Sequence, residues 1–268
     1  MRMMTMMMML ALATRLLGSG VVQASLSPLQ TSASAQHAEL AGRQGAAVWT
    51  DADANIRWVF GGRRVTPTLM ELRDDLWRHN VTSRTWTWVA GGLLPSLSNY
   101  GAGGWPGSRQ VACAWSIYGN ATNGGGTRSA QHYMFGGFGM ASTGAPGLLG
   151  DMWRFYPNNL TFSFVSGWQT TSHPGSYATI KQFSSGGAPG SRTGSSCWTT
   201  YNRYLWLSSG VGCDASTHCR TVQPQMLNDV WRYDTSTGRW AWMQGSNLFG
   251  DMVWFPRSQT STYTAISS

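Results

Sequence analysis

The sequence predicts an all-β protein made of repeated four-stranded sheets, and three observations predict it. A tryptophan-rich phrase occurs three times, most fully as LNDVWRYDTSTGRWAWMQG over residues 227–245. In each copy an anchor tryptophan (Trp77, Trp153 or Trp231) precedes the first aromatic residue of the following strand by nine positions. The composition, with 33 Gly, 15 Trp and only 11% charged residues, is neither that of a disordered chain nor that of a coiled coil. Internal repeats decide the fold before any single element is assigned.

The first strand of each repeat opens with an arginine, and an aromatic residue follows six positions later. The pairs are Arg43 with Trp49, Arg109 with Trp115, Arg192 with Trp198, and Arg257 with Tyr263. Pro-Gly-Ser precedes the second and third openings, and a turn of this composition delivers the chain into a strand. The fourth opening predicts the first strand of a further repeat.

The second strand of each repeat is aromatic and apolar, and it ends in small residues. These are the pairs Gly61 with Gly62, Gly136 with Gly137, and Ser209 with Gly210. Glycine pairs at the end of a strand allow positive φ and a close approach of two backbones.

The third strand carries the anchor tryptophan, and the fourth carries two aromatic residues spaced i and i+2. The fourth-strand pairs are Trp86 with Trp88, Phe162 with Phe164, and Trp240 with Trp242. Such pairs share one face because strand side chains alternate. One sheet cannot bury these rings alone, whereas sheets stacked around an axis bury them against each other. This favours a propeller over a sandwich or a solenoid.

The repeats resemble kelch repeats, in which an apolar strand, two glycines, a spaced D-x-W-x-Y/F and a further tryptophan follow one another. They are particularly similar to the long form that begins with G-S-R and ends with W-x-W-V/M-x-G. The resemblance covers about residues 40–263 and implies a kelch β-propeller with the arginine-opened strand nearest the axis. Departures from the pattern are Ser209 in place of a glycine, the pair Phe162 and Phe164 in place of tryptophans, and the turn at Asn159.

We therefore expect three blades of four antiparallel strands and the first strand of a fourth, which is an incomplete propeller. The blades are expected over 40–105, 106–188 and 189–254, and the fourth begins within 255–268. Propellers close with four to eight blades, so the missing blades would come from a longer chain or from another subunit.

The amino-terminal residues predict secretion. Residues 1–24 resemble a signal peptide, with a transit peptide or a misplaced start codon as alternatives, and 25–39 form a flexible lead-in. No later stretch is long and apolar enough for a membrane span. Three N-x-S/T sequons, at Asn80, Asn120 and Asn159, agree with a secreted or cell-surface glycoprotein.

The chain has four cysteines. Cys213 and Cys219 bracket one short loop segment, which predicts a disulfide between them. Cys113 and Cys197 occupy nearly matching places in successive repeats, so a bridge between repeats stays open. Metal binding by the cysteines is the alternative, but no C-x-x-C occurs.

The recurrent charges predict structural ion pairs. Each opening arginine has a counterpart in the aspartate before an anchor tryptophan, which is Asp75, Asp151 or Asp229. Because every repeat has both residues, we interpret them as buried or half-buried Arg–Asp pairs that tie blades or loops together. The net charge of +8 does not predict nucleic-acid binding, because no run of Lys and Arg exceeds two residues.

Binding residues should differ between repeats and lie in the loops after the glycines or between blades. The candidates are Arg63, Arg64, Phe138, Met140, the segment 211–225, Trp105, Trp168 and Trp254. The aromatic members suit stacking on a sugar or a peptide, or packing over a blade end.

Neither a metal nor a cofactor is predicted. Glu71, Asp75 and His79 have the E-x-x-x-D-x-x-x-H spacing of the iron-binding signature in plant nitrile-specifier kelch proteins. On an extended strand, however, residues four apart are separated by about 13 Å, which is too far to chelate one ion. No catalytic triad is visible in the sequence.

The sequence thus favours a non-catalytic, secreted or cell-surface kelch scaffold that binds a protein or glycan through its loop rim. The alternative is a fragment of an extracellular kelch-propeller oxidoreductase, similar to galactose oxidase, with catalytic residues outside this chain. A gene product without independent activity is the third reading. Fold alone does not decide among them.

Overall fold

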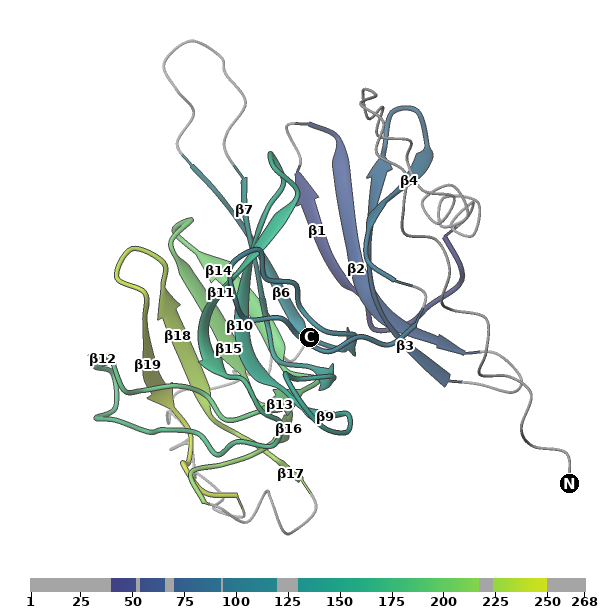
Figure 1. Cartoon of the computed structure of the whole chain (residues 1–268). Helices are drawn as coiled ribbons and strands as arrows, with labels where there is room; N and C mark the ends of the chain where they lie inside the picture. The colour runs from purple at the N-terminus through teal and green to yellow at the C-terminus, as the bar shows by residue number, and fades with distance from the viewer. Residues whose placement is uncertain are drawn as a thin grey trace, which may run out of the picture. The chain divides into compact units, whose positions relative to one another are not determined.

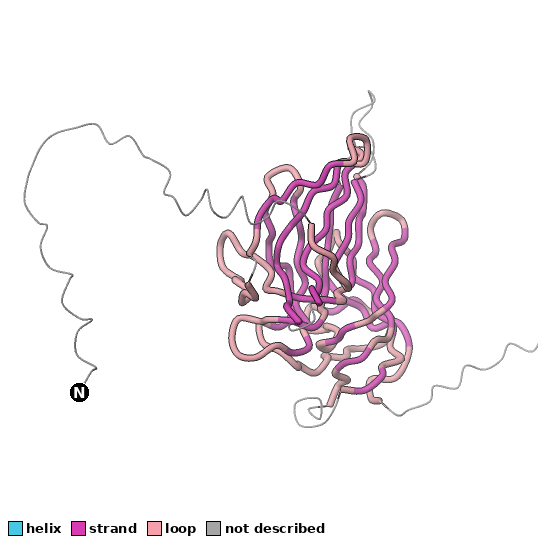
Figure 2. Tube along the Cα trace, turned by 90° about the vertical axis from the view of Figure 1, so that its right-hand side faces the viewer, coloured by secondary structure: helices cyan, strands magenta, loops and turns pink. Residues whose placement is uncertain are grey.

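In the computed structural model, antiparallel strands make up all the regular structure that is described, and no helix occurs among these residues (Figures 1 and 2). The structure describes residues 40–51, 54–65, 70–92, 94–119, 130–216 and 224–249. All of them lie in the second of the two parts into which the chain divides, Met1–Ala38 and Glu39–Ser268. The strands form five small antiparallel sheets that are arranged as a β-propeller. Within the described ranges there is consequently no helix suited to crossing a membrane.

The first sheet holds the four strands of one repeat in chain order. They are β1 (Ala47–Asp51), β2 (Ile56–Val65), β3 (Met70–Asn80) and β4 (Thr85–Ala90). Trp49 is paired with Trp58, and Trp58 with Arg78, so these side chains share one face. Trp77 is paired with Trp88, and both occupy the opposite face. We call the face with Trp49, and its equivalent in the other sheets, the forward face, and the face with Trp77 the back face.

The second and third sheets repeat this pattern and have the same antiparallel register. The second contains β6 (Cys113–Tyr118), β7 (Ala130–Phe135), β10 (Gly150–Tyr156) and β11 (Thr161–Trp168). The third contains β14 (Ser196–Thr200), β15 (Tyr204–Ser208), β18 (Val230–Asp234) and β19 (Arg239–Gln244).

A fifth strand in the third sheet was not predicted from the sequence. β12 (Phe183–Ser184) pairs with β19 at the outer edge, although residues 106–188 were assigned to the preceding blade. The segment is too short and too polar in its surroundings to show a strand pattern. It covers the edge that β19 would otherwise expose.

Two three-stranded sheets continue the second and third sheets beyond their small-residue pairs. One contains β5 (Arg109–Gln110), β8 (Phe138–Gly139) and β9 (Gly147–Leu148). The other contains β13 (Arg192–Thr193), β16 (Val211–Gly212) and β17 (Gln225–Met226). In the first sheet the same continuation lies within β2 and β3, whose ladder shifts register at the glycine pair.

The glycine pairs are required by their backbone geometry. Gly136 and Gly137 have φ of 67° and 97°, and a Cβ on Gly137 would lie 2.6 Å from the carbonyl oxygen of Gln110. Ser209, which departs from the pattern, has φ of 59°. An L-residue in this region is strained by roughly 1–2 kcal/mol. The third repeat therefore forms the same turn with some loss of stability.

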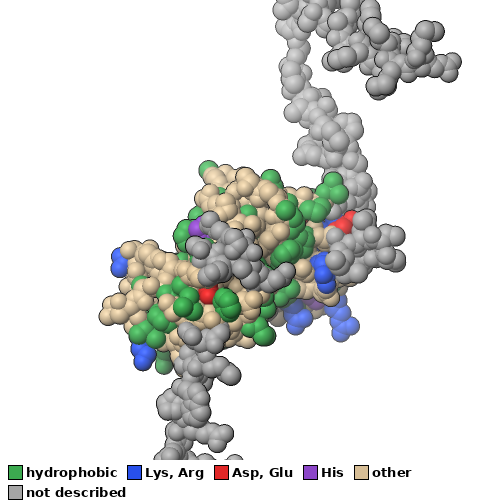
Figure 3. Space-filling view, turned by 90° about the horizontal axis from the view of Figure 1, so that it is seen from below, with side chains coloured by type: hydrophobic (Ala, Val, Ile, Leu, Met, Phe, Trp, Pro, Cys, Tyr) green, Lys and Arg blue, Asp and Glu red, His purple; other side chains and the backbone are tan. Residues whose placement is uncertain are grey.

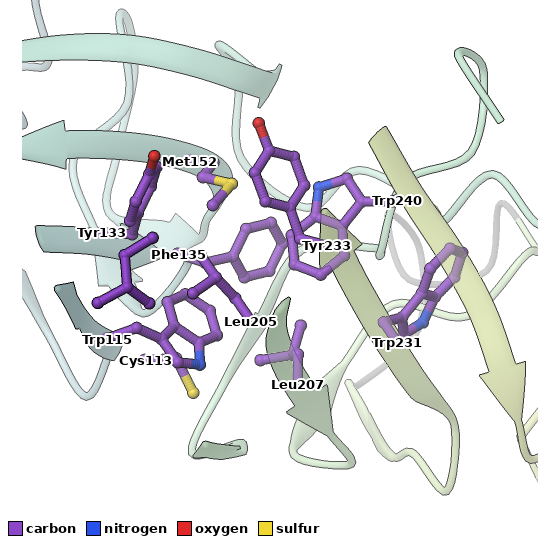
Figure 4. Packing of buried hydrophobic residues seen from close by; sticks show 11 residues of the cluster. Cys113, Trp115, Tyr133, Phe135, Met152, Leu205, Leu207, Trp231, Tyr233 and Trp240 are labelled. Carbon is purple, nitrogen blue, oxygen red and sulfur yellow. The ribbon is translucent and has the colours of Figure 1, made fainter. Parts of the chain in front are cut away.

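Two apolar clusters fill the spaces between the three larger sheets. The first joins the forward face of the first sheet to the back face of the second, and it includes Trp49, Phe60 and Trp153. The second joins the forward face of the second sheet to the back face of the third. Figure 4 shows Trp115, Tyr133 and Phe135 of the second sheet beside Leu205, Leu207 and Trp240 of the third.

The three anchor tryptophans, Trp77, Trp153 and Trp231, are buried. Trp86 differs from its equivalents Phe162 and Trp240, which are buried, because it is 42% exposed. Trp86 lies on the back face of the first sheet, and no described sheet packs on it.

Replacing one anchor should strongly destabilise the fold. Trp153 is fully buried and packs against Tyr100 and Phe164. We expect Trp153→Ala to lower the free energy of unfolding by about 3–5 kcal/mol, measured by denaturant unfolding. Tyr201→Ala is the control, because this tyrosine is 91% exposed and should change the value by less than about 0.5 kcal/mol. Equal effects would contradict this account of the core.

His132 lies buried between the first and second sheets. Its ring centroid is 6.0 Å from those of Trp49 and Phe155. Nδ1 shares a hydrogen bond of 2.9 Å with Ser116, and Nε2 has no partner among the described residues. Burial lowers the pKa of His132 to about 4, so the folded protein holds the neutral ring.

The stability of the protein should therefore depend on the charge of this histidine. Below the ordinary pKa of 6.5, the unfolded chain binds a proton that the buried ring of His132 does not bind until the pH approaches 4. The free energy of unfolding should fall as the pH drops through this window. His132→Leu, which copies Leu205 at the equivalent place in the third sheet, should have a shallower slope between pH 6.5 and 4 in urea unfolding. Parallel slopes would be inconsistent with a neutral His132.

Candidate functional site

A buried Arg–Asp–Trp cluster recurs in each of the three larger repeats. In the second repeat, the Arg109 guanidinium donates to Asp151 at 2.7 and 2.8 Å, to Gly107 O at 3.1 Å and to Ser98 Oγ at 3.1 Å. Trp153 Nε1 donates to the same carboxylate at 2.7 Å. Arg109 and Asp151 are both fully buried. The hydrogen bonds above offset the cost of removing the two charges from water.

The other two repeats have the same arrangement. Arg192 contacts Asp229 at 2.6 and 2.7 Å, and Trp231 Nε1 donates to Asp229 at 2.7 Å. Arg43 forms the corresponding bidentate pair with Asp75. The predicted Arg–Asp pairs are thus confirmed as structural contacts within the repeats.

Two tyrosines complete these clusters and were not predicted from the sequence. Tyr100 donates its hydroxyl to Asp151 at 2.8 Å, and Tyr177 donates to Asp229 at 2.6 Å. Burial would raise the pKa of Asp229, but the charge of Arg192 and the donated hydrogen bonds outweigh it and lower the pKa. Tyr100 and Tyr177 precede their arginines by different numbers of residues in the sequence, so no common spacing identifies them.

A second set of residues lies next to these clusters in the sequence, directly after the opening arginines and after the small-residue pairs. The residue after each opening arginine pairs with the residue after each glycine pair, in the three combinations Gln44 with Arg63, Gln110 with Phe138, and Thr193 with Val211. The repeats are joined here by backbone hydrogen bonds, from Val111 N to Gly45 O at 2.6 Å and from Gly194 N to Val111 O at 3.3 Å. We call these residues, together with Val111, the rim surface.

The rim surface varies between the repeats, unlike the clusters beneath it. Arg63, Phe138 and Val211 occupy one equivalent position with three different chemistries. Phe138 is 37% exposed and Val111 is 42% exposed. Seen from below, hydrophobic side chains are scattered over the visible surface, and the visible Lys and Arg side chains lie toward its margins (Figure 3).

Val111 is the most unusual member of the rim surface. Its φ is 54°, a region that β-branched residues rarely adopt. The equivalent positions in the other repeats are glycines, Gly45 and Gly194, with φ of 68° and 69°. The second repeat therefore presents an exposed isopropyl group at a position where the backbone favours glycine.

The other predicted binding residues lie in different settings. Trp105 is half-buried, packs against Phe60 and Phe162, and donates to Asp74 O at 3.1 Å. Trp168 stacks on His173 with ring centroids 3.8 Å apart. Arg64 pairs with Glu71 in the ladder between β2 and β3. Met140 is half-buried, and its backbone binds Ser98 and Ser108. Trp254 and residues 217–223 of the segment 211–225 lie outside the described ranges.

The members of the E-x-x-x-D-x-x-x-H pattern are engaged separately. Glu71 pairs with Arg73, Asp75 binds Arg43 and Trp77, and His79 stacks on Trp86 at 4.4 Å. Among the described residues, no group of three or more His, Cys, Asp and Glu side chains is placed to hold a metal ion.

The predicted glycosylation sites and disulfide cysteines lie in different structural settings. Asn80 Oδ1 accepts hydrogen bonds from the backbone of Thr82 and Ser83, and Asn159 Oδ1 accepts one from Thr161. Asn120 and Cys219 lie outside the described residues, so the Cys213–Cys219 disulfide stays a prediction. Cys113 and Cys197, for which the sequence leaves a bridge open, are free thiols in the structure.

Comparison with known proteins assigns the chain to no family. No family model and no curated protein matches the chain. Among solved structures, the chain is similar to the one described as the structure of YjhT, with 13% sequence identity and a TM-score of 0.44. The similarity covers 76% of this chain and 52% of YjhT, so the chain spans about half the length of that protein.

The buried ion pairs should be essential for stability. We expect Asp151→Asn to lower the free energy of unfolding by about 3–5 kcal/mol, because Arg109 keeps its charge and loses its counter-ion. The control is Arg203→Gln, which breaks the pair with Asp234 at a side chain that is half exposed and should have a clearly smaller effect. Chemical denaturation measures both variants, and similar losses would show that burial of the Arg109 pair has no special weight.

Proposed function

We propose that the three larger sheets are three kelch-type blades and that the two small sheets extend the second and third blades. Each larger sheet holds the four strands of one repeat. β8 follows β7 directly after Gly136 and Gly137, and β16 follows β15 after Ser209 and Gly210, which supports this assignment. The predicted opening of a fourth blade, within 255–268, lies outside the described residues.

For this chain we propose the function of a non-catalytic, secreted or cell-surface scaffold that binds a protein partner through the rim surface. Val111 is the observation that carries the proposal. Strained backbone conformations tend to occur at functional sites, where the side chain repays its cost by a contact. Here the strained residue is exposed, apolar and unlike its equivalents in both other repeats.

The chemistry of the rim surface suits a protein partner better than a glycan. Val111, Phe138 and Val211 are exposed and apolar. The rim surface also contains the polar residues Gln110, which pairs with Phe138, and Arg63, which pairs with Gln44. Sugars are usually held by flat aromatic rings with hydrogen-bonding neighbours, whereas Phe138 is the only aromatic member of the rim surface. Mixed apolar and arginine surfaces are typical of protein interfaces. No observation on the described residues favours the oxidoreductase alternative.

Removing the Val111 side chain should separate binding from stability. Val111→Gly restores the residue found in the other two repeats, so we expect folding stability to hold or rise by about 1 kcal/mol. Peptides selected from a random display library against the immobilised chain serve as the probe. Their affinity should fall roughly 10-fold or more in Val111→Gly and in Phe138→Ser, measured by calorimetry.

The matched control for binding is Tyr201→Ser, which removes an exposed aromatic ring at the turn between β14 and β15, away from the rim surface. Peptide affinity should be unchanged in this variant. Peptides that bind all variants equally would overturn the proposal. Binding on a glycan array that is lost in Phe138→Ser would instead assign the same surface to glycans.

A further inference from the structure

The two interfaces between the larger sheets are built from equivalent positions. In each, the forward face of one sheet meets the back face of the next. Trp49 of the first sheet packs against His132, Phe155 and Phe162 of the second. Trp115 of the second sheet belongs to one cluster with Leu205, Tyr233 and Trp240 of the third, which are the equivalents of those three residues. One rule therefore describes both interfaces.

Hydrogen bonds follow the same rule. Trp49 Nε1 donates to Tyr133 O at 2.8 Å, and Trp115 Nε1 donates to Trp206 O at 3.0 Å. Tyr133 and Trp206 are equivalent residues of the second strand, because each pairs with the aromatic residue of its own first strand. The third member of the row, Trp198, has no such acceptor among the described residues.

The forward face of the third sheet remains uncovered within the described ranges. Trp198 is 42% exposed and stacks on Trp206, with ring centroids 5.6 Å apart and an interplanar angle of 6°. The guanidinium of Arg232 lies 5.5 Å from the Trp206 ring. The equivalent residues in the first two sheets, Trp49 and Trp115, are buried because a further sheet packs on them. A soluble protein rarely exposes two stacked indoles on a flat sheet without a partner.

One end of the back face of the first sheet is exposed in the complementary way, with no described sheet packed on it, whereas Trp77 at the other end of that face is buried. Arg57, His79 and Trp86 occupy the places that His132, Phe155 and Phe162 occupy in the second sheet. Arg57 is exposed, and Trp86 is as exposed as Trp198. By the rule of the two internal interfaces, this is the face on which a first-strand tryptophan packs. An arginine at the place of His132 suits such a contact, because a guanidinium binds an indole ring.

We propose that a second copy of this chain packs the back face of its first sheet on the forward face of the third sheet. The reciprocal contact forms at the other end, so the two copies close a ring with two-fold symmetry. The occupant is a second copy because the chain itself carries both complementary faces. This inference rests on the proposal of three blades, and two copies would give six, within the four to eight that close a propeller.

The proposal fixes the contacts of the new interface. Trp198 Nε1 donates to Trp58 O of the partner copy, as Trp49 and Trp115 donate to Tyr133 and Trp206. Gly194 O accepts from Gly45 N of the partner copy, continuing the row in which Gly45 O accepts from Val111 N and Val111 O from Gly194 N. The Trp198 ring lies against Arg57 of the partner copy.

A thiol pair within the chain supplies the template for a test. Cys113 and Cys197 pack in one cluster across the second interface, and each thiol donates to a carbonyl of the facing segment, Ser195 O at 3.3 Å or Ala114 O at 3.9 Å. Their equivalents at the first interface are Ala47 and Ala114, which both belong to its apolar cluster. At the proposed interface, the equivalents are Ser196 and Val48, and both are exposed in the single chain.

Cross-linking then tests the register of the interface. The double variant Val48→Cys with Ser196→Cys, treated with oxidised glutathione, should form two disulfides between copies by thiol–disulfide exchange, releasing two molecules of reduced glutathione for each disulfide. On non-reducing gels the product should migrate at twice the mass of the chain. The wild type, each single variant and the shifted pair Thr50→Cys with Ser196→Cys should give little of this product.

Sedimentation of the full chain tests the assembly itself. We expect a mass of twice 29.3 kDa at micromolar concentration. Trp198→Arg, which places a like charge against Arg57 of the partner copy, should raise the dimer dissociation constant at least 10-fold. Adding Arg57→Glu to this variant should restore the dimer. Circular dichroism identifies any variant that fails to fold. If Trp198→Arg does not fold, Trp198→Ser is used in its place, with the same expected loss of dimer.

Three results would overturn the proposal. One is a monomer at all concentrations up to 100 micromolar. Coverage of these faces by residues 1–39 or 250–268 of the same chain would give this result. Another is a dimer that the double cysteine variant does not cross-link above its controls. The third is a mass that keeps rising with concentration, which indicates open chains. Val111→Gly should leave the dimer unchanged, so loss of rim binding and loss of dimerisation are separate outcomes.

Discussion

A sheet with large aromatic rings on both faces requires a neighbour on both faces, and the structure of this protein depends on that requirement. Each larger sheet carries its first-strand tryptophan or its equivalent on one face and its anchor tryptophan on the other. Neither face is polar enough to be solvated as the outer face of an ordinary antiparallel sheet would be. Stacking the sheets in one direction satisfies both faces at once, because a forward face packs on a back face in both interfaces.

The Arg–Asp–Trp clusters fix the position of each sheet end relative to its own opening strand. The guanidinium of Arg109 reaches Asp151 of β10, Gly107 of the preceding turn and Gly136 after β7, so one side chain ties three segments together. A hydrophobic contact could not define this geometry as closely, because it has no direction. The directional bonds also leave the residues above them free to vary, which is why the rim surface differs between repeats while the clusters do not.

The repeat was predictable from the sequence because its residues contact one another at fixed spacings. The anchor tryptophans and the glycine pairs keep register, and the structure places them in the expected strands and turns. The opening arginines recur as predicted but do not lie in the first strands: Arg109 and Arg192 begin the separate strands β5 and β13, and Arg43 precedes β1. Tyr100, Tyr177 and β12 were missed because they come from connections of unequal length, where no spacing recurs. The strain at Val111 could not be predicted either, since only the backbone angle shows that this valine occupies a position suited to glycine.

Exposed tryptophans have different meanings in a repeat protein and in a protein with one core. In a single core, an exposed indole such as Trp86 would be read as an isolated surface residue. In a stacked array, the same position is buried in every repeat that has a neighbour, as Phe162 and Trp240 show. The exposure of Trp86 and Trp198 therefore reports where the array of described sheets ends and says nothing against the repeat. Because both interior interfaces pair a forward face with a back face, the proposed dimer extends the same directional contact to the two end faces.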